Sequence, residues 1–104
     1  MSFGMVVTLR VHEGCDADFM AAISELASVV AATEPGTKLY RPLQVRGEPG
    51  TYVIMELYDT EADHDAHLDN PEARPYFAQL SEFIAERTSV LSLDPLPVSP
   101  AVCG

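Results

Sequence analysis

Hydrophobic residues follow two different periods along the chain, and each period predicts one kind of element. Side chains of residues 4–11 alternate between two faces with a period of two, which predicts a strand. One face of this strand is apolar and consists of Met5, Val7, Leu9 and Val11. From about Asp16 to Thr33 apolar residues recur at intervals of three and four instead, which predicts an amphipathic helix.

Two Pro-Gly pairs divide the middle of the chain. Pro35 ends the first helix, and together with Gly36 it fits the central positions of a type II turn. Strands are predicted over 37–45 and 51–58, and they are joined by a hairpin loop over 46–50 whose two glycines are able to take positive φ. Because Pro42 cannot donate to a strand ladder, the first of these strands is expected at a sheet edge.

The last third of the chain predicts helix and then strand. Asp59 is expected to cap a short helix over 60–69, and a longer helix should begin near Glu72. Residues 88–94 alternate as a fourth strand. The order βαββαβ predicts an α+β fold of the ferredoxin-like plait type, with a four-stranded antiparallel sheet and both long helices on one face.

The strand over 51–58 is apolar on both faces. One face carries Tyr52, Ile54 and Tyr58, and the other carries Val53, Met55 and Leu57. A sheet covered by helices on one side normally has a polar open face. The second face is therefore expected to be buried against a partner subunit or a ligand.

Composition narrows the class of protein. With 104 residues, 47% hydrophobic and 21% charged, the chain is expected to form one globular domain over 1–94, followed by a proline-rich, extended or disordered tail over 95–104. Its formal charge of −10 argues against nucleic-acid and membrane-surface partners, and the absence of a long apolar run or signal peptide predicts a cytoplasmic protein. Cys15 and Cys103 are too few for a disulfide framework or a zinc cluster, so they are interpreted as inert thiols.

Four motifs together resemble the antibiotic biosynthesis monooxygenase family, including the quinol monooxygenases. They are E-P-G-T at 34–37, Tyr40, E-L-Y-D at 56–59 and E-A-x-x-x-A-H-L at 61–68. The resemblance spans about residues 5–94 and implies a homodimer whose two sheets face each other as an α/β-barrel. It also implies cofactor-free oxidation of a quinol or polycyclic phenol by dioxygen. The chain has no tryptophan, which weakens a likeness to haem-degrading relatives.

A cofactor-free oxygenase needs a base, a dry aromatic slot and room for dioxygen. His67 is the candidate base, because imidazole titrates near neutral pH; the alternative is a half-exposed histidine on an acidic helix. Glu56 lies in an apolar strand, so it must pair, protonate or reach water. Pairing with Arg10 or Arg41 is one possibility, and a raised pKa with a role in proton transfer is the other.

Aromatic residues are candidates for contact with a planar substrate, although core packing is an alternative for each. Tyr76 is a candidate catalytic residue, and the candidate substrate-binding residues are Tyr40, Tyr52, Tyr58, Phe77 and His64. His64 and His67 stand three apart near Asp63, but no third ligand follows at a typical spacing, so neither a metal nor another cofactor is predicted.

These observations predict a cofactor-independent monooxygenase acting on a small aromatic substrate with dioxygen. Two alternatives stay open. One is a non-catalytic dimeric module that binds a small molecule or assists a pathway enzyme, and the other is an isomerase or decarboxylase-like activity on the same scaffold.

Overall fold

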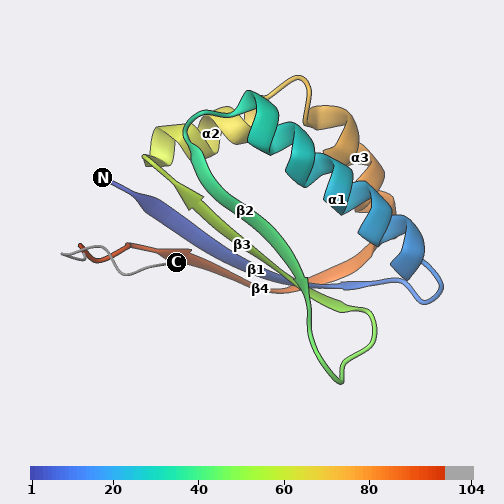
Figure 1. Ribbon diagram of the computed structural model, residues 1–104. Coiled ribbons are helices and arrows are strands. Elements are labelled where there is room, and N and C mark those ends of the chain that lie inside the picture. The colour runs from blue at the N-terminus through green and yellow to red at the C-terminus, as the bar shows by residue number, and fades with distance from the viewer. Residues whose placement is uncertain (98–104) are drawn as a thin grey trace.

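The computed structural model describes residues 1–97 (Figure 1). The elements, in chain order, are β1 Phe3–Val11, α1 Asp16–Thr33, β2 Thr37–Gln44, β3 Thr51–Tyr58, α2 Glu61–Asp69, α3 Arg74–Phe83 and β4 Ile84–Leu93. The strands form one sheet in the order β2-β3-β1-β4, and all neighbouring pairs are antiparallel. The predicted ferredoxin-like fold is therefore confirmed, with Pro42 on an edge strand as expected.

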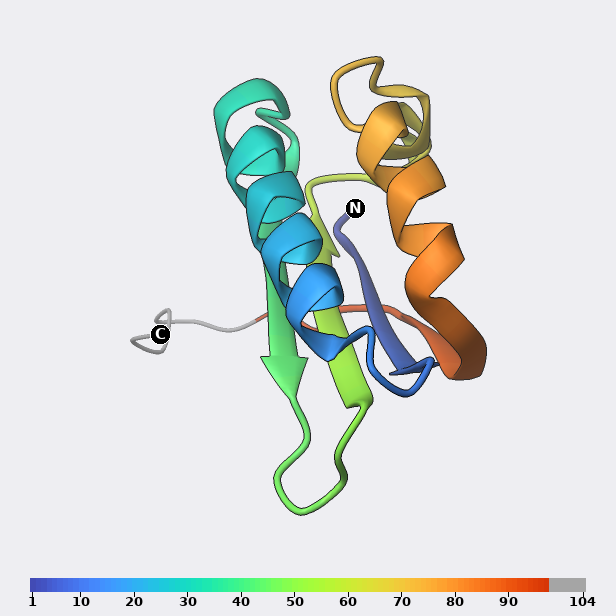
Figure 2. The same ribbon diagram turned by 90° about the vertical axis from the view of Figure 1, so that its right-hand side faces the viewer.

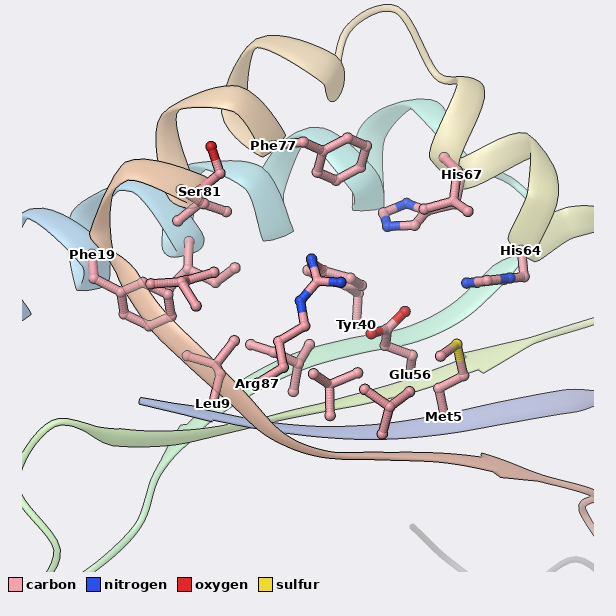
Figure 3. A pocket seen from close by; sticks show the side chains of 17 residues that line it. Met5, Leu9, Phe19, Tyr40, Glu56, His64, His67, Phe77, Ser81 and Arg87 are labelled. Carbon is pink, nitrogen blue, oxygen red and sulfur yellow. The ribbon is translucent and has the colours of Figure 1, made fainter. Parts of the chain in front are cut away.

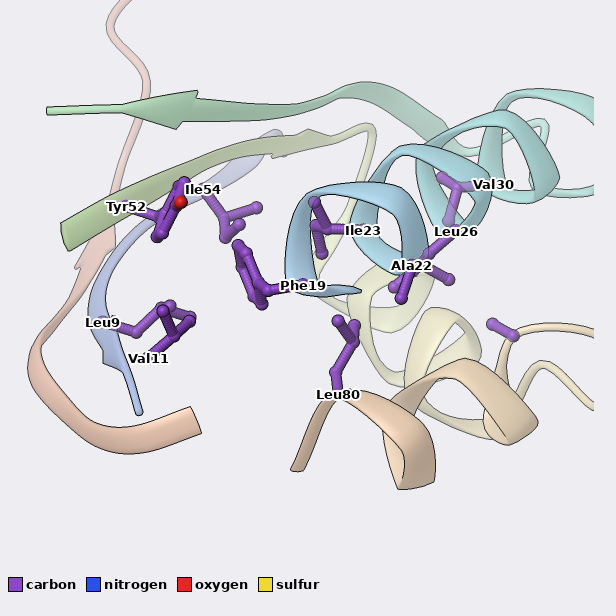
Figure 4. Close-up of a cluster of buried hydrophobic side chains, with 11 residues drawn as sticks. Leu9, Val11, Phe19, Ala22, Ile23, Leu26, Val30, Tyr52, Ile54 and Leu80 are labelled. Carbon is purple, nitrogen blue, oxygen red and sulfur yellow. The ribbon is translucent and has the colours of Figure 1, made fainter. Parts of the chain in front are cut away.

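The two long helices cover one face of the sheet. Figures 1 and 2 show α1 and α3 side by side above the strands, with α2 at the end of the sheet opposite the β2–β3 hairpin. The core lies under α1, where Phe19, Leu26 and Val30 are almost completely buried against Ile54 and Leu80 (Figure 4). Each such side chain stabilises the fold by about 1.5–3 kcal/mol.

The turn after α1 closes as predicted but by a different geometry. The amide of Thr37 donates to the carbonyl of Glu34 at 3.1 Å, yet Gly36 does not have the positive φ that a type II turn requires. That part of the prediction is wrong. Gly36 is required for space instead, because a Cβ on it would lie 2.2 Å from Oδ1 of Asp63. The two hairpin glycines do take positive φ.

The boundaries of the last elements differ from the prediction. The cap of α2 is Thr60 rather than Asp59, and Thr60 and Asp63 form a reciprocal capping box. Helix α3 begins at Arg74 rather than near Glu72. Strand β4 begins at Ile84 rather than at 88, directly after α3, because its ladder with β1 continues to the end of that strand.

The other face of the sheet carries no helix (Figure 2). Large apolar side chains from β2, β3 and β4 face this side and are 39–53% exposed: Leu39, Leu43, Met55, Leu91 and Leu93. The polar residues Thr8, Arg41 and Ser89 also face it. The two faces of β3 thus differ as expected, with Tyr52, Ile54 and Tyr58 buried beneath the helices. Burial of the open face against a partner stays a prediction.

Within residues 1–97, none of the helices has the length and apolar character that a membrane crossing requires. Residues 95–97 have no regular structure, and the rest of the predicted tail, with Cys103, lies outside the described residues.

Candidate functional site

A cavity of about 370 Å³ lies between the helices and the sheet (Figure 3). Most of its wall is apolar and comes from β1, β3, α1 and α3. The polar side chains that line it are Tyr40, Glu56, His64, His67, Ser81 and Arg87. An apolar cavity with a few convergent polar groups is the usual form of a small-molecule site, and this volume lies at the lower end of the usual range.

His67 extends from α2 into this cavity and is only 3% exposed. Its Nδ1 lies 2.8 and 2.9 Å from the two carboxylate oxygens of Glu34, whose side chain is 8% exposed. The ring packs between Tyr40 and Phe77, with both ring centroids at 5.1 Å. The alternative of a half-exposed histidine is therefore wrong, because the ring is enclosed by aromatic neighbours.

Glu34, at the C-terminus of α1, is held on both oxygens. Oε1 accepts a hydrogen bond from Thr37 Oγ1 at 2.7 Å, and Oε2 accepts one from Asn70 Nδ2 at 2.8 Å. Burial alone would raise the pKa of Glu34, but the hydrogen bonds from Asn70, Thr37 and His67 outweigh it and lower the pKa below its ordinary value. Glu34 is therefore an ionised carboxylate at neutral pH.

The charge of Glu34 determines the tautomer of His67. A carboxylate can only accept hydrogen bonds, so Nδ1 of a neutral His67 must carry the proton, and Nε2 then has a free lone pair. No buried side-chain nitrogen or oxygen in residues 1–97 lacks a partner, and no partner is found for Nε2, so this atom reaches the open space of the cavity. The pair Glu34–His67 thus presents a basic nitrogen to a bound molecule.

Glu56 lines the same cavity from β3. The predicted pairing with Arg10 or Arg41 is wrong: Arg10 pairs with Glu86, and Arg41 lies opposite Met55 on the open face. The carboxyl accepts a hydrogen bond from the hydroxyl of Tyr58 instead. Burial raises the pKa of Glu56, and Tyr58, His67, His64 and Arg87 offset that rise only in part.

Two predicted substrate-binding tyrosines do not line the cavity. Tyr52 is in the core beneath Phe19, with ring centroids 4.6 Å apart, and its hydroxyl donates to Asp16 at 2.7 Å. Burial, together with Asp16, raises the pKa of Tyr52 to about 12. Tyr58 is fully buried behind Glu56, and its ring lies 5.1 Å from His64. Burial and the charge of Glu56 raise its pKa strongly, so Tyr58 acts by orienting Glu56.

Tyr76 also stands outside the cavity wall. It is half-buried against the core, one helix position away from Phe77, and successive helix positions point about 100° apart. The predicted residues that the structure brings together are therefore His67, Glu56, Tyr40, Phe77 and His64. Burial raises the pKa of Tyr40, with a further contribution from Glu56 and Glu34, so its hydroxyl remains a donor at neutral pH.

Three polar residues of the site escaped the sequence prediction. Glu34 entered the sequence analysis only within the E-P-G-T motif at 34–37, and Asn70 was not among the candidate residues, although its amide bridges Glu34 and Thr33. Arg87 fell just outside the predicted strand. Across residues 1–97, no three His, Cys, Asp or Glu side chains come close enough together to hold a metal ion.

Comparisons with known proteins agree on one family. The sequence model described as antibiotic biosynthesis monooxygenase matches residues 2–79. A candidate monooxygenase of this kind from Caulobacter crescentus has 27% identity, and its structure superposes with a TM-score of 0.87 over 92% of this chain and 91% of its own. A second protein described in the same way, from Chloroflexus aurantiacus, has 23% identity. Its structure superposes with a TM-score of 0.84 over 94% of this chain and 96% of its own. No curated protein matches the sequence.

Proposed function

The chain belongs to the antibiotic biosynthesis monooxygenase family, and we propose that it oxidises a polycyclic phenol or quinol with dioxygen in the cavity beside His67. One observation carries this proposal: a buried imidazole is fixed through Nδ1 by an ionised carboxylate and turns Nε2 toward an apolar cavity. That is the arrangement of a general base in a water-poor site.

The reaction begins with proton transfer. Nε2 of His67 takes the phenolic proton, and the resulting phenolate is electron-rich enough to give one electron to dioxygen. The substrate thus supplies the electron that a metal or flavin supplies in other oxygenases. The substrate radical and superoxide then combine through a new carbon–oxygen bond. The imidazolium returns its proton, and the product of this step is a hydroperoxide.

Loss of water completes the oxidation. The hydrogen on the oxygenated carbon leaves as a proton, the O–O bond breaks, and hydroxide leaves with that bond's electron pair as the new C=O forms. Glu56, whose pKa is raised by burial, is placed to give a proton to the departing hydroxide, which leaves as water, and to recover one from the carbon. One oxygen atom ends in the quinone and the other in water, which balances a four-electron oxidation.

The open face of the sheet supports a homodimer. Its exposed apolar residues come from β2, β3 and β4, and on a soluble monomer a patch of this kind is unusual. A second copy of the same face would bury it with twofold symmetry. The cavity lies on the opposite side of the sheet, so dimerisation would stiffen its floor without filling it.

The proposal is tested with anthrone, whose enol form is a tricyclic phenol. Oxygen uptake and anthraquinone formation are measured with protein freed of metals by chelation. Because proton transfer to His67 starts the reaction, His67→Ala should lower the rate by about 10²-fold or more. The matched control is His12→Ala, in an exposed connection outside the cavity, which should keep the full rate.

Unchanged turnover in His67→Ala would overturn the assignment of the base. Saturable binding of anthrone without any oxygen uptake above that of the buffer would favour the non-catalytic binding module instead.

A further inference from the structure

A bulge in β4 changes which of its side chains face the cavity. Thr8 lies opposite Ser89, but the next residue of β1, Leu9, lies opposite Arg87, so Thr88 is an extra residue in the ladder. In a regular strand that has Val90 facing the cavity, the next residues to face it would be Thr88 and Glu86. The bulge reverses this alternation and turns Arg87 inward.

The same bulge places the two charged residues of β4, Glu86 and Arg87, on opposite faces of the sheet. Glu86 comes to lie opposite Arg10 and pairs with it, away from the cavity. Arg87 extends from the floor of the cavity toward the helices, with its guanidinium among Glu56, Tyr40 and Phe77 (Figure 3). No ion pair or hydrogen bond is found for Arg87 within residues 1–97. The same is true of Arg41 and Arg46, which lie outside the cavity, whereas Arg10, Lys38 and Arg74 each have an acidic partner.

The charge of Arg87 is only partly balanced inside the cavity. Glu56 is the one acidic side chain among the described residues that line it, and its carboxyl lies beyond ion-pair distance of the guanidinium. Burial favours the neutral form of Glu56, and the Tyr58 hydroxyl already occupies one of its oxygens. Arg87 is itself exposed, so a chain with a net charge of −10 keeps a cation with unused donors on a solvent-accessible part of this cavity wall.

We propose that Arg87 binds the carboxylate of an acidic aromatic substrate, whose ring system extends along Phe77 toward His67. A guanidinium offers a planar fork of N–H donors that matches a carboxylate in a bidentate contact. A single cation suits a singly charged planar anion, whereas a phosphate dianion would call for more than one. The inference builds on the proposed function only in placing the substrate in this cavity.

The experiment compares two ligands of nearly equal shape, 2-naphthoate and 2-naphthamide. Binding to the full chain is measured by calorimetry at pH 7 and low ionic strength under nitrogen, so that no turnover occurs. The wild type should bind the acid about 10- to 100-fold more tightly than the amide, as expected for charge-assisted hydrogen bonds to a guanidinium. This preference should weaken in added salt.

Variants assign the preference to one side chain. Arg87→Gln should abolish the preference for the acid while leaving the affinity for the amide within about twofold, and Arg87→Lys, which keeps the charge but loses the fork, should retain part of it. Arg46→Gln, on the exposed hairpin loop, is the matched control and should behave as the wild type. Circular dichroism verifies that each variant is folded.

Equal binding of acid and amide by the wild type would overturn the inference, as would a preference that survives in Arg87→Gln. Its failure is distinguishable from failure of the proposed function. A charge preference without oxygen uptake would refute only the oxygenase, and oxygen uptake without a charge preference would refute only the carboxylate site.

Discussion

Replacing Glu34 by glutamine should disable the base without removing it. The carboxylate receives hydrogen bonds from three donors, on His67, Asn70 and Thr37. A glutamine amide has one oxygen, which accepts, and one NH₂ group, which only donates. The NH₂ group would therefore face at least one partner that also donates, and no hydrogen bond could form there. His67 can relieve that conflict by moving its proton to Nε2, and this shift would occupy the lone pair that faces the cavity.

The magnitude follows from the bond that is lost. A hydrogen bond to a charged group contributes about 1.5–3 kcal/mol, which corresponds to about a 10- to 150-fold loss of kcat/KM in Glu34→Gln if that bond orients the base. Thr37→Val is the matched comparison, because it removes one hydrogen bond but keeps the charge. The loss of kcat/KM in Thr37→Val should be several times smaller than the loss in Glu34→Gln.

Two measurements check this reasoning. The kinetic one is the pH profile of kcat/KM for oxygen uptake with anthrone. The second needs no activity: ¹⁵N NMR of the imidazole ring reports which nitrogen of His67 carries the proton, and the wild type should show it on Nδ1. A Glu34→Gln variant with wild-type kcat/KM and the same tautomer would refute the role of Glu34.

The same carboxylate makes stability depend on pH. Because folding lowers the pKa of Glu34, its contribution is fully present above the ordinary glutamate pKa of 4.5 and is lost as the pH falls through the lower folded value. The free energy of unfolding of the wild type should therefore fall below about pH 4.5 more steeply than that of Glu34→Gln. Urea unfolding at several pH values measures the difference.

The remaining predictions concern the turn and the open face. Gly36→Ala should lower the free energy of unfolding by about 0.5–2 kcal/mol, because its Cβ would displace Asp63 from the capping box of α2; thermal unfolding measures this, and an unchanged Tm would contradict the close approach. Met55→Lys, which places a charge in the middle of the open face, should convert a dimer into a monomer in size-exclusion chromatography with light scattering, whereas Glu48→Lys on the hairpin should not. A monomeric wild type at micromolar concentration would refute the proposed dimer.

The sequence predicted the elements wherever the apolar period was regular. Strand β3 and helix α1 follow their periods along their whole length, and both were placed correctly. The predicted start of β4, at residue 88, was too late. The bulges of this strand break the alternation of its side chains between the two faces over residues 84–88. The same irregularity concealed Arg87, whose direction depends on the pairing with β1 and not on its neighbours in the chain.

The site was predictable only in part for a related reason. His67 and Glu56 stood out because a histidine and a carboxylate at those positions demanded an explanation. Glu34 did not, because its partners His67 and Asn70 lie 33 and 36 residues further along the chain. The sequence also places Tyr52 on the correct face of β3 without revealing that Phe19 covers it there.

Helix α3 passes into strand β4 with no intervening loop, Phe83 ending the one and Ile84 beginning the other. The amide of His12 donates to the carbonyl of Phe83 at 2.8 Å and ties this junction to the end of β1. Arg87, however, pairs with Leu9 in the ladder between β1 and β4, so an outward swing of α3 to admit a bulkier ring would move Phe77 and leave the guanidinium in place. The wall that limits the size of a bound ring and the side chain proposed to select its charge thus stand on separate parts of the fold, so a variant selected for larger molecules should keep the proposed preference for acids over their neutral analogues.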